Sequence, residues 1–157
     1  MSSDAIARQA TLEFRGRALE VEAALLEAGA LAGEETERVC PVTHTWGEGC
    51  YVREWNSPAE MVVVSKIHKV AHPFFILKGE VSVLTEEGVR RFKAPYHGIT
   101  PAGTKRLLYT HTPVQGVTVH VTDKTDLTEI EEEIIAKDFD DPRIAAADLA
   151  KLKDVVE

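Results

Sequence analysis

The middle of the sequence, residues 51–122, is a series of short apolar runs separated by turn-forming residues. The runs are rich in Val, Leu and aromatic residues and lie at 61–65, 74–77, 81–84, 107–110 and 117–121. Gly, Pro and charged residues interrupt them at 78–79, 86–88, 95–98 and 101–103. Runs of this kind predict strands, and a spacing of roughly ten residues leaves no room for helices between them. The pattern predicts an antiparallel sandwich or barrel rather than a βαβ sheet.

Helical periodicity precedes the predicted strands. Residues 4–33 predict one helix, with one apolar stripe through Phe14, Ala18 and Val21 and a second stripe through leucines. The leucines of this second stripe are Leu12, Leu19 and Leu26. Either the helix has one broad core face and a few exposed leucines, or the leucine stripe packs against another subunit. The second alternative predicts at least a homodimer.

Helical periodicity also follows the strands. Asp126 and Glu129 form a predicted capping box, and Asp141-Pro142 begins a second helical segment that runs to Val156. We predict one domain, 1–157, with an N-terminal helix at 4–33, a β core at about 50–123 and acidic C-terminal helices at 124–157.

Composition limits the compartment and the partners. A chain of 157 residues can bury enough apolar surface to fold without disulfides, and Cys40 and Cys50 form no CxxC pair. With no amino-terminal apolar run, we expect a cytoplasmic protein. The net charge is −8, and residues 123–141 contribute −7 of it, from nine acidic residues against Lys124 and Lys137. This distribution argues against binding to nucleic acids or membranes, both of which need a basic surface.

His68 and His72 are the first candidates for chemistry. A helix would place both on one face, but Pro73 and the preceding valines argue against a helix here. On one continuous strand the two rings would lie about 13 Å apart, too far to share a metal. A turn at 69–71 between two strands would bring them together.

The run from Ser57 to Gly79, SPAEMVVVSKIHKVAHPFFILKG, resembles the first motif of the cupin superfamily, G-x5-H-x-H-x3-E-x6-G. With the last Gly at Gly79, the two His positions fall on Lys66 and His68, and the Glu position falls on His72. The segment APYHGITPAGTKRLLYT resembles the second motif, G-x5-P-x-G-x2-H-x3-N, with Arg106 at its His position. The sequence is also similar to small cupins encoded in tailed-phage and bacterial genomes.

The resemblance implies an all-β, cupin-type jelly roll whose interior receives the side chains of the motif positions. Lys66 and Arg106 stand where a metal-binding cupin has imidazoles, so the usual four-ligand site is lost. His68 and His72 remain, and His120, on the last predicted strand, completes a three-His cluster if it points inward. Such a cluster suits one divalent transition metal, Zn, Fe, Ni or Mn. Alternatively, the histidines only hydrogen-bond and bind nothing.

Lys66 and Arg106 would give the pocket two positive charges, which favour a small anionic ligand such as a carboxylate or a phosphate. The alternative is that one of them pairs with a carboxylate such as Glu54 and is structural. Tyr109 and His97 are further candidates for contacts with the ligand, Tyr109 as a general acid and His97 at the mouth of the pocket. A Cys40–His44–Cys50 metal site is a weaker hypothesis because it has no fourth ligand.

Two classes of function follow. The first is a small-molecule-binding cupin that acts, as a metal-dependent enzyme, on a small anionic substrate. The second is a noncatalytic, oligomeric cupin that serves as a phage accessory, a virion component or another structural protein. The fold alone does not separate the two classes.

Overall fold

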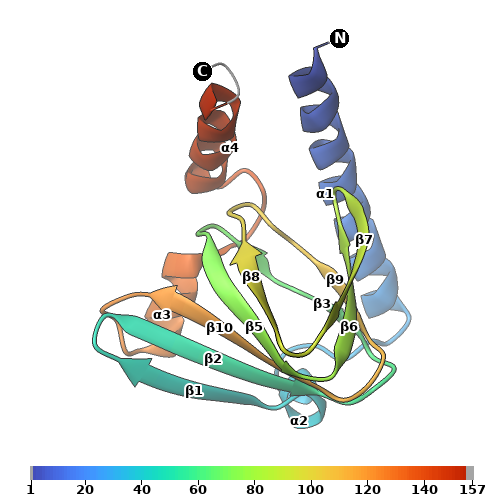
Figure 1. The fold of residues 1–157 in the computed structure, drawn as a ribbon, viewed down its shortest axis with the longest axis vertical. Coiled ribbons are helices and arrows are strands. Elements are labelled where there is room, and N and C mark those ends of the chain that lie inside the picture. Colours follow the sequence, from blue (N-terminus) through green and yellow to red (C-terminus); the bar gives the residue numbers. More distant parts are fainter. Residues whose placement is uncertain (1, 155–157) are drawn as a thin grey trace.

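A computed structural model describes the backbone of residues 2–154 and the side chains of residues 2–150. Strands occupy the middle of the chain and helices lie before and after them (Figure 1). The helices are α1 (Ser3–Glu27), α2 (Glu34–Val39), α3 (Leu127–Ile134) and α4 (Pro142–Asp154). The strands are β1 (Val42–Gly47), β2 (Cys50–Ser57), β3 (Val62–Val64), β4 (Ile67–His68), β5 (His72–Lys78), β6 (Glu80–Thr85), β7 (Gly88–Lys93), β8 (Tyr96–Thr100), β9 (Leu107–Thr110), β10 (Val114–Val121) and β11 (Ile135–Ala136). The end of the predicted last helix, with Val156, lies outside the described residues.

The strands form two main antiparallel sheets. The larger sheet has the order β1-β2-β10-β5-β8 and the smaller one β3-β9-β6-β7. Leaving β1 aside, the pairs are nested along the chain: β2 with β10, β3 with β9, β5 with β8, and β6 with β7. This nesting is the jelly roll, so the predicted fold class is confirmed, with helices at both ends.

An apolar cluster fills one end of the space between the sheets. Its fully buried members come from β5, β6, β7 and β10 and are Ile76, Val81, Val83, Phe92 and Val114. Phe74, Tyr96 and Trp55 pack against them. Phe74, Ile76 and Val83 therefore point inward. Val62 does not, and its side chain is exposed opposite Tyr109 of β9.

α1 is shorter than the predicted helix 4–33. The Ser2 hydroxyl accepts a hydrogen bond from the Ala5 amide at the start of the helix, and the helix ends at Glu27. Gly29 follows with φ of 89°, a left-handed conformation that glycine adopts without strain and that ends a helix. Residues 34–39 then form the separate helix α2. Along α1, Arg15 binds Asp148 of α4 at 2.8 Å, which ties the first and last helices together.

α3 covers the other end of the larger sheet. Its cap is as predicted, since the Asp126 carboxylate accepts a hydrogen bond from the Glu129 amide at 3.1 Å. Ile130 and Ile134 of α3 pack on Tyr51 of β2. Directly after α3, β11 pairs with β4, with Ile135 opposite His68. The helix and the strand that follows it are therefore anchored beside the histidines. None of the described helices is both long and apolar enough to span a membrane.

Candidate functional site

The imidazoles of His68, His72 and His120 meet inside the jelly roll. The ring centroids of His72 and His120 are 4.4 Å apart, those of His68 and His72 are 4.5 Å apart, and those of His68 and His120 are 6.2 Å apart. The three residues are supplied by β4, β5 and β10, which are distant along the chain. The structure thus brings together the three histidines that the sequence proposes as ligands.

Strand pairing explains this meeting. The chain bends between β4 and β5 at residues 69–71, so His68 and His72 approach each other across the bend. In the larger sheet, Thr118 of β10 lies opposite Phe74 of β5. Because β10 and β5 run antiparallel, this register places His120 beside His72, on the same face as Thr118 and Phe74.

Burial keeps the imidazoles neutral. It lowers the pKa of His68 from 6.5 to about 3, with further lowering from the neighbouring His72 and His120 and from Arg53 and Arg106. Burial also lowers the pKa of His120 to about 4, and it lowers the pKa of His72. A neutral imidazole has a nitrogen lone pair to offer a metal or a proton, so at neutral pH this is a cluster of bases.

The ring nitrogens differ in their partners. His72 Nδ1 lies 3.1 Å from the Val70 carbonyl oxygen. Since a carbonyl only accepts, this nitrogen carries the proton, and the lone pair of neutral His72 is on Nε2. His120 Nε2 contacts the Thr118 hydroxyl at 3.0 Å. His68 Nδ1 is buried, with no hydrogen-bond partner among the described residues.

These features decide how well the site suits a transition metal. Three neutral imidazoles are the right donors, and the Val70 carbonyl orients His72 as an outer partner of a metal ligand does. However, no three His, Cys, Asp or Glu side chains in the described part of the chain already point at one ion position. The residues therefore have the chemistry of metal ligands, but in this structure the described side chains are not arranged around one ion position.

Arg106 lies beside the histidines. Its guanidinium carbon is 5.3 Å from the centroid of the Phe74 ring, and its Nε is buried without a hydrogen-bond partner in the described structure. The Arg106 amide donates to the Ser65 hydroxyl at 2.8 Å, which fixes the backbone just before β9. Burial lowers the pKa of Arg106, as expected for a cation withdrawn from water.

Arg53 is a second half-buried cation here, and it was not among the residues predicted for the site. It lies on β2 opposite Thr118 of β10, and burial lowers its pKa. The signal was present: Tyr51, Arg53 and Trp55 alternate along one strand and share a face. An arginine between two large aromatic residues at a spacing of two faces the interior.

Lys66 is not in the interior, which corrects the prediction that it occupies a vacant ligand position. Its side chain is 63% exposed and pairs with Glu131 of α3. The next residue, Ile67, takes the buried position, so alternation turns Lys66 toward solvent. The suggested Glu54 is not its partner, because Glu54 accepts hydrogen bonds from Asn56 and Gln115.

Tyr109 and His97 also lie outside the predicted pocket. Thr110, the neighbour of Tyr109, is fully buried, so Tyr109 faces outward, where its ring packs edge-on against His111 at 5.0 Å. His97 is exposed on the outer face of the larger sheet and packs against Phe75, with ring centroids 6.0 Å apart. In both cases the alternation along the strand points the ring away from the histidine cluster.

The Cys40–His44–Cys50 cluster does not form. Both cysteines are free, and the Cys40 sulfur lies 3.6 Å from the Ser57 hydroxyl. His44 Nδ1 instead contacts the Tyr51 hydroxyl at 2.7 Å. The Tyr51 ring stacks on His120 with centroids 5.8 Å apart, so His44 joins the edge of the histidine cluster through Tyr51.

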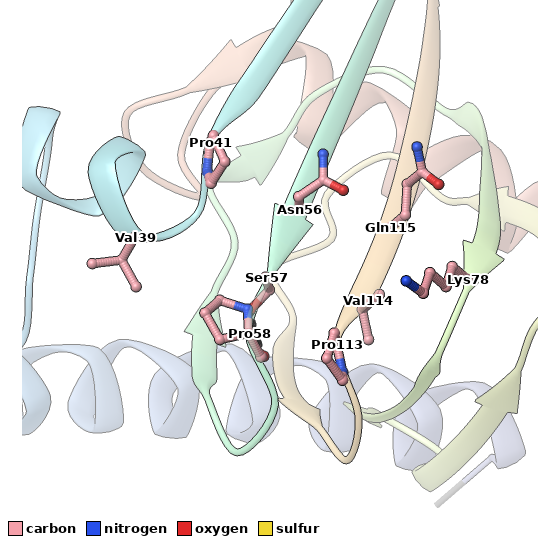
Figure 2. A pocket seen from close by; sticks show the side chains of 9 residues that line it. All are labelled: Val39, Pro41, Asn56, Ser57, Pro58, Lys78, Pro113, Val114 and Gln115. Carbon is pink, nitrogen blue, oxygen red and sulfur yellow. Dashed lines mark hydrogen bonds between the residues drawn. The ribbon is translucent and has the colours of Figure 1, made fainter.

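Two surface hollows lie elsewhere. One, of about 270 Å³, is at the opposite end of β2 and β10 from the histidines (Figure 2). Its lining consists of Val39, Pro41, Asn56, Ser57, Pro58, Lys78, Pro113, Val114 and Gln115. The other, of about 460 Å³, is formed by Lys69 and by residues 132–142, most of them charged. Neither hollow is lined by the histidines.

Comparisons with known proteins bear on the fold. No protein-family profile matches the sequence, and no curated protein matches it either. Solved structures do resemble the chain. A cupin superfamily protein from Desulfitobacterium hafniense DCB-2 is 9% identical with a TM-score of 0.46, covering 54% of this chain and 78% of its own.

Two more solved structures resemble the chain at similarly low sequence identity. A cupin domain from Bordetella pertussis Tohama I is 16% identical with a TM-score of 0.43, covering 53% of this chain and 93% of its own. The DMSP lyase DddQ from Ruegeria pomeroyi DSS-3 is 19% identical with a TM-score of 0.49, covering 63% of this chain and 55% of its own. At these identities the likeness concerns the path of the backbone and not the site.

Proposed function

The chain has the cupin jelly roll, and from that premise we propose that it binds a small anionic molecule beside a divalent transition metal held by His68, His72 and His120. One observation carries the proposal: the imidazoles of buried His72 and His120 and of half-buried His68 meet with ring centroids 4.4 to 6.2 Å apart. Zn, Fe, Ni and Mn are the metals that such a set of donors suits.

The unpartnered ring nitrogen of His68 supports a metal. His68 Nδ1 is buried without a partner in the described structure, and leaving a buried nitrogen unpaired is costly. A metal ion there would remove that cost. Three protein ligands also leave coordination positions open, as in catalytic rather than structural zinc sites. When bound, the metal would supply a Lewis acid that polarises an oxygen of the substrate.

Arg106 supports the anion. Its guanidinium lies against Phe74, next to His72 on the same strand, and no carboxylate of the described residues pairs with it. A carboxylate or phosphate would find a bidentate partner there. The anion would also offset the repulsion between the arginine and a metal dication. On this proposal the protein is a small-molecule-binding cupin, with metal-dependent catalysis on the anion as its activity.

Metal stoichiometry tests the proposal. Protein purified without an affinity tag is stripped with a chelator, loaded separately with Zn, Ni, Mn or Fe(II), and analysed by elemental mass spectrometry. We expect one tightly held ion per chain for at least one metal, lost in His68→Gln and His72→Gln. The matched controls are His97→Gln and His111→Gln, which should keep the ion. Absence of a stoichiometric ion, or an ion that survives both cluster substitutions, would overturn the proposal.

A second candidate function is a noncatalytic, oligomeric cupin, such as a phage accessory or virion component. The observation that favours it is the leucine stripe of α1, whose members Leu12, Leu19 and Leu26 are 50%, 41% and 50% exposed. A second copy of this chain would cover them. Light scattering is then expected to report a dimer or larger, and Leu19→Glu should dissociate it without unfolding it. Val89→Glu, at another exposed apolar side chain, is the control. A monomer at micromolar concentration would contradict this alternative.

A further inference from the structure

Arg53 and Arg106 are both associated with one set of paired residues that runs across three neighbouring strands of the larger sheet. Arg53 of β2 is opposite Thr118 of β10, and Thr118 is opposite Phe74 of β5. These three strands are neighbours in the sheet (Figure 1). Because adjacent strands are about 4.8 Å apart, the Cα atoms of Arg53 and Phe74 are separated by roughly 10 Å. The guanidinium of Arg106 covers Phe74, so the two arginines bracket Thr118 from opposite sides.

Both arginines approach the histidine cluster. Each lowers the pKa of His68 through its charge, and Arg53 does the same to His120. Thr118, between the arginines, contacts His120 Nε2 through its hydroxyl. Thr118 is therefore flanked by two cations and an imidazole.

Neither guanidinium has an ion-pair partner among the described residues. The ion pairs found there involve Arg15, Lys66, Lys69, Arg91 and Lys105. The carboxylates that act on Arg53 from a distance are Glu37 and Glu131, and Glu131 is already paired with Lys66. Glu86 acts on Arg106 in the same distant way. Two half-buried positive charges are thus left without an ion-pair partner among the described residues, and a bound anion would supply one.

We propose that Arg53 and Arg106 together form a clamp for a dianion with two separate carboxylates, one for each guanidinium. The inference rests on the proposed function, because it specifies the class of the anion bound beside the three histidines. Lys66 faces solvent, so Arg53 and Arg106 are the two cations beside Thr118, and a dicarboxylate offers one negative group to each.

A calorimetric titration with small anions tests the clamp. Chelator-treated protein at neutral pH and fixed ionic strength is titrated with acetate, malonate, succinate, glutarate and phosphate. We expect at least one dicarboxylate to bind roughly tenfold or more tightly than acetate, because it forms a second charge-assisted bidentate contact. Arg53→Gln and Arg106→Gln should each reduce that dicarboxylate to the affinity of acetate. Arg17→Gln, at an exposed arginine of α1, should leave every affinity unchanged.

Further variants keep the test decisive if a glutamine substitution unfolds the protein. Arg53→Lys and Arg106→Lys keep the charge but lose the two-pronged contact, so each should weaken the dicarboxylate by an intermediate factor. Circular dichroism confirms that the variants are folded. In a double-substitution cycle the two losses should not add, because one broken contact already removes the advantage of the second carboxylate.

The outcomes separate the clamp from the broader proposal. Equal affinities for acetate and all dicarboxylates, or binding that Arg53→Gln leaves intact, would overturn the clamp while anion binding at Arg106 stands. Phosphate binding more tightly than every dicarboxylate, with both arginines required, would overturn the class of ligand. No binding of any anion would overturn both the clamp and the anionic ligand of the proposed function.

Discussion

The two ends of the jelly-roll interior are built from the same strands but contain different kinds of side chain. β5 contributes Ile76 to the apolar end and His72 to the polar end, and β10 contributes Val114 and His120 in the same way. The apolar end is packed with aliphatic and aromatic residues that have no polar atoms to satisfy. The polar end contains three imidazoles, two of them with pKa lowered to about 3 and about 4, and two half-buried arginines.

This difference indicates that different residues of the jelly-roll interior account for stability and for binding. Apolar packing stabilises the fold wherever it occurs, whereas buried imidazoles and guanidiniums cost free energy unless they find partners. Trp55 stands between the two ends, with its ring over Gly116. We conclude that the apolar end stabilises the fold and that the polar end carries the proposed binding. The variants below are ordered by their expected effect and ask whether the two ends can be separated.

The largest effect is expected from Phe92→Ala in the apolar end. Removing this buried ring leaves a cavity between the sheets, which costs about 3–5 kcal/mol of unfolding free energy. Urea denaturation measures the loss. Metal and anion affinities of the folded fraction should stay at wild-type values. Phe75→Ala is the matched control, since Phe75 is 37% exposed on the outer face. A weakened metal affinity in folded Phe92→Ala would show that the two ends are coupled.

Gly116→Ala tests the boundary between the ends. A Cβ at this position would lie 2.3 Å from the Trp55 ring, so the ring or the strand must shift. Such overpacking costs about 1–3 kcal/mol. In a Trp55→Phe background the ring is smaller, so Gly116→Ala should lower the stability less than it does in the wild type. Thermal denaturation of the wild-type and Trp55→Phe proteins, each with and without Gly116→Ala, measures the two losses. Equal costs in both backgrounds would mean that the contact with Trp55 is not what requires glycine.

The pH dependence of stability should come from the polar end. Burial lowers the pKa of His68 to about 3 in the folded chain, against 6.5 as the ordinary value. Between these values the unfolded chain binds more protons, so stability is constant above pH 6.5 and falls as the pH decreases below it. The slope is about 1.4 kcal/mol per pH unit for each such imidazole. Urea titrations at a series of pH values should show a shallower fall for His68→Gln than for wild type. An unchanged slope in this variant would contradict a buried neutral His68.

The smallest effect is expected from Lys66→Met. Its ion pair with Glu131 is on the surface, and such pairs contribute about 0–1 kcal/mol. Stability and anion affinity should therefore match wild type closely, in contrast to Arg106→Met, which should lose the anion. Denaturation and calorimetry measure the two effects. Loss of anion binding in Lys66→Met would show that Lys66 contributes to the anion site, which would contradict its position at the surface.

The sequence predicted the fold better than the site. Apolar runs and turn residues identified the strands, and the cupin motif framework with a turn at 69–71 placed His68 and His72 together. His120 was expected to join them only if it pointed inward. Arg53 was missed because it lies outside the motifs. Lys66 was placed wrongly because a motif position aligns residues along the chain, whereas the side of the strand that a side chain occupies depends on its neighbours, here the buried Ile67. Tyr109 was a candidate outside the motif positions, and it faces outward because the next residue, Thr110, is buried. The predicted helix extended to residue 33, beyond the observed end of α1 at Glu27, because the prediction followed the apolar pattern and gave too little weight to Gly29 as a helix end.

The central claim is that the three imidazoles are buried, neutral and act as one set of ligands. Nuclear magnetic resonance of histidine side chains labelled with ¹³C and ¹⁵N tests it directly, with the exposed His97 as an internal reference. We predict that three histidines stay neutral well below pH 6.5 and that all three shift together on addition of one equivalent of Zn²⁺, while His97 does not. Titration of the three near 6.5, or a Zn²⁺ response that leaves them unshifted, would contradict the account.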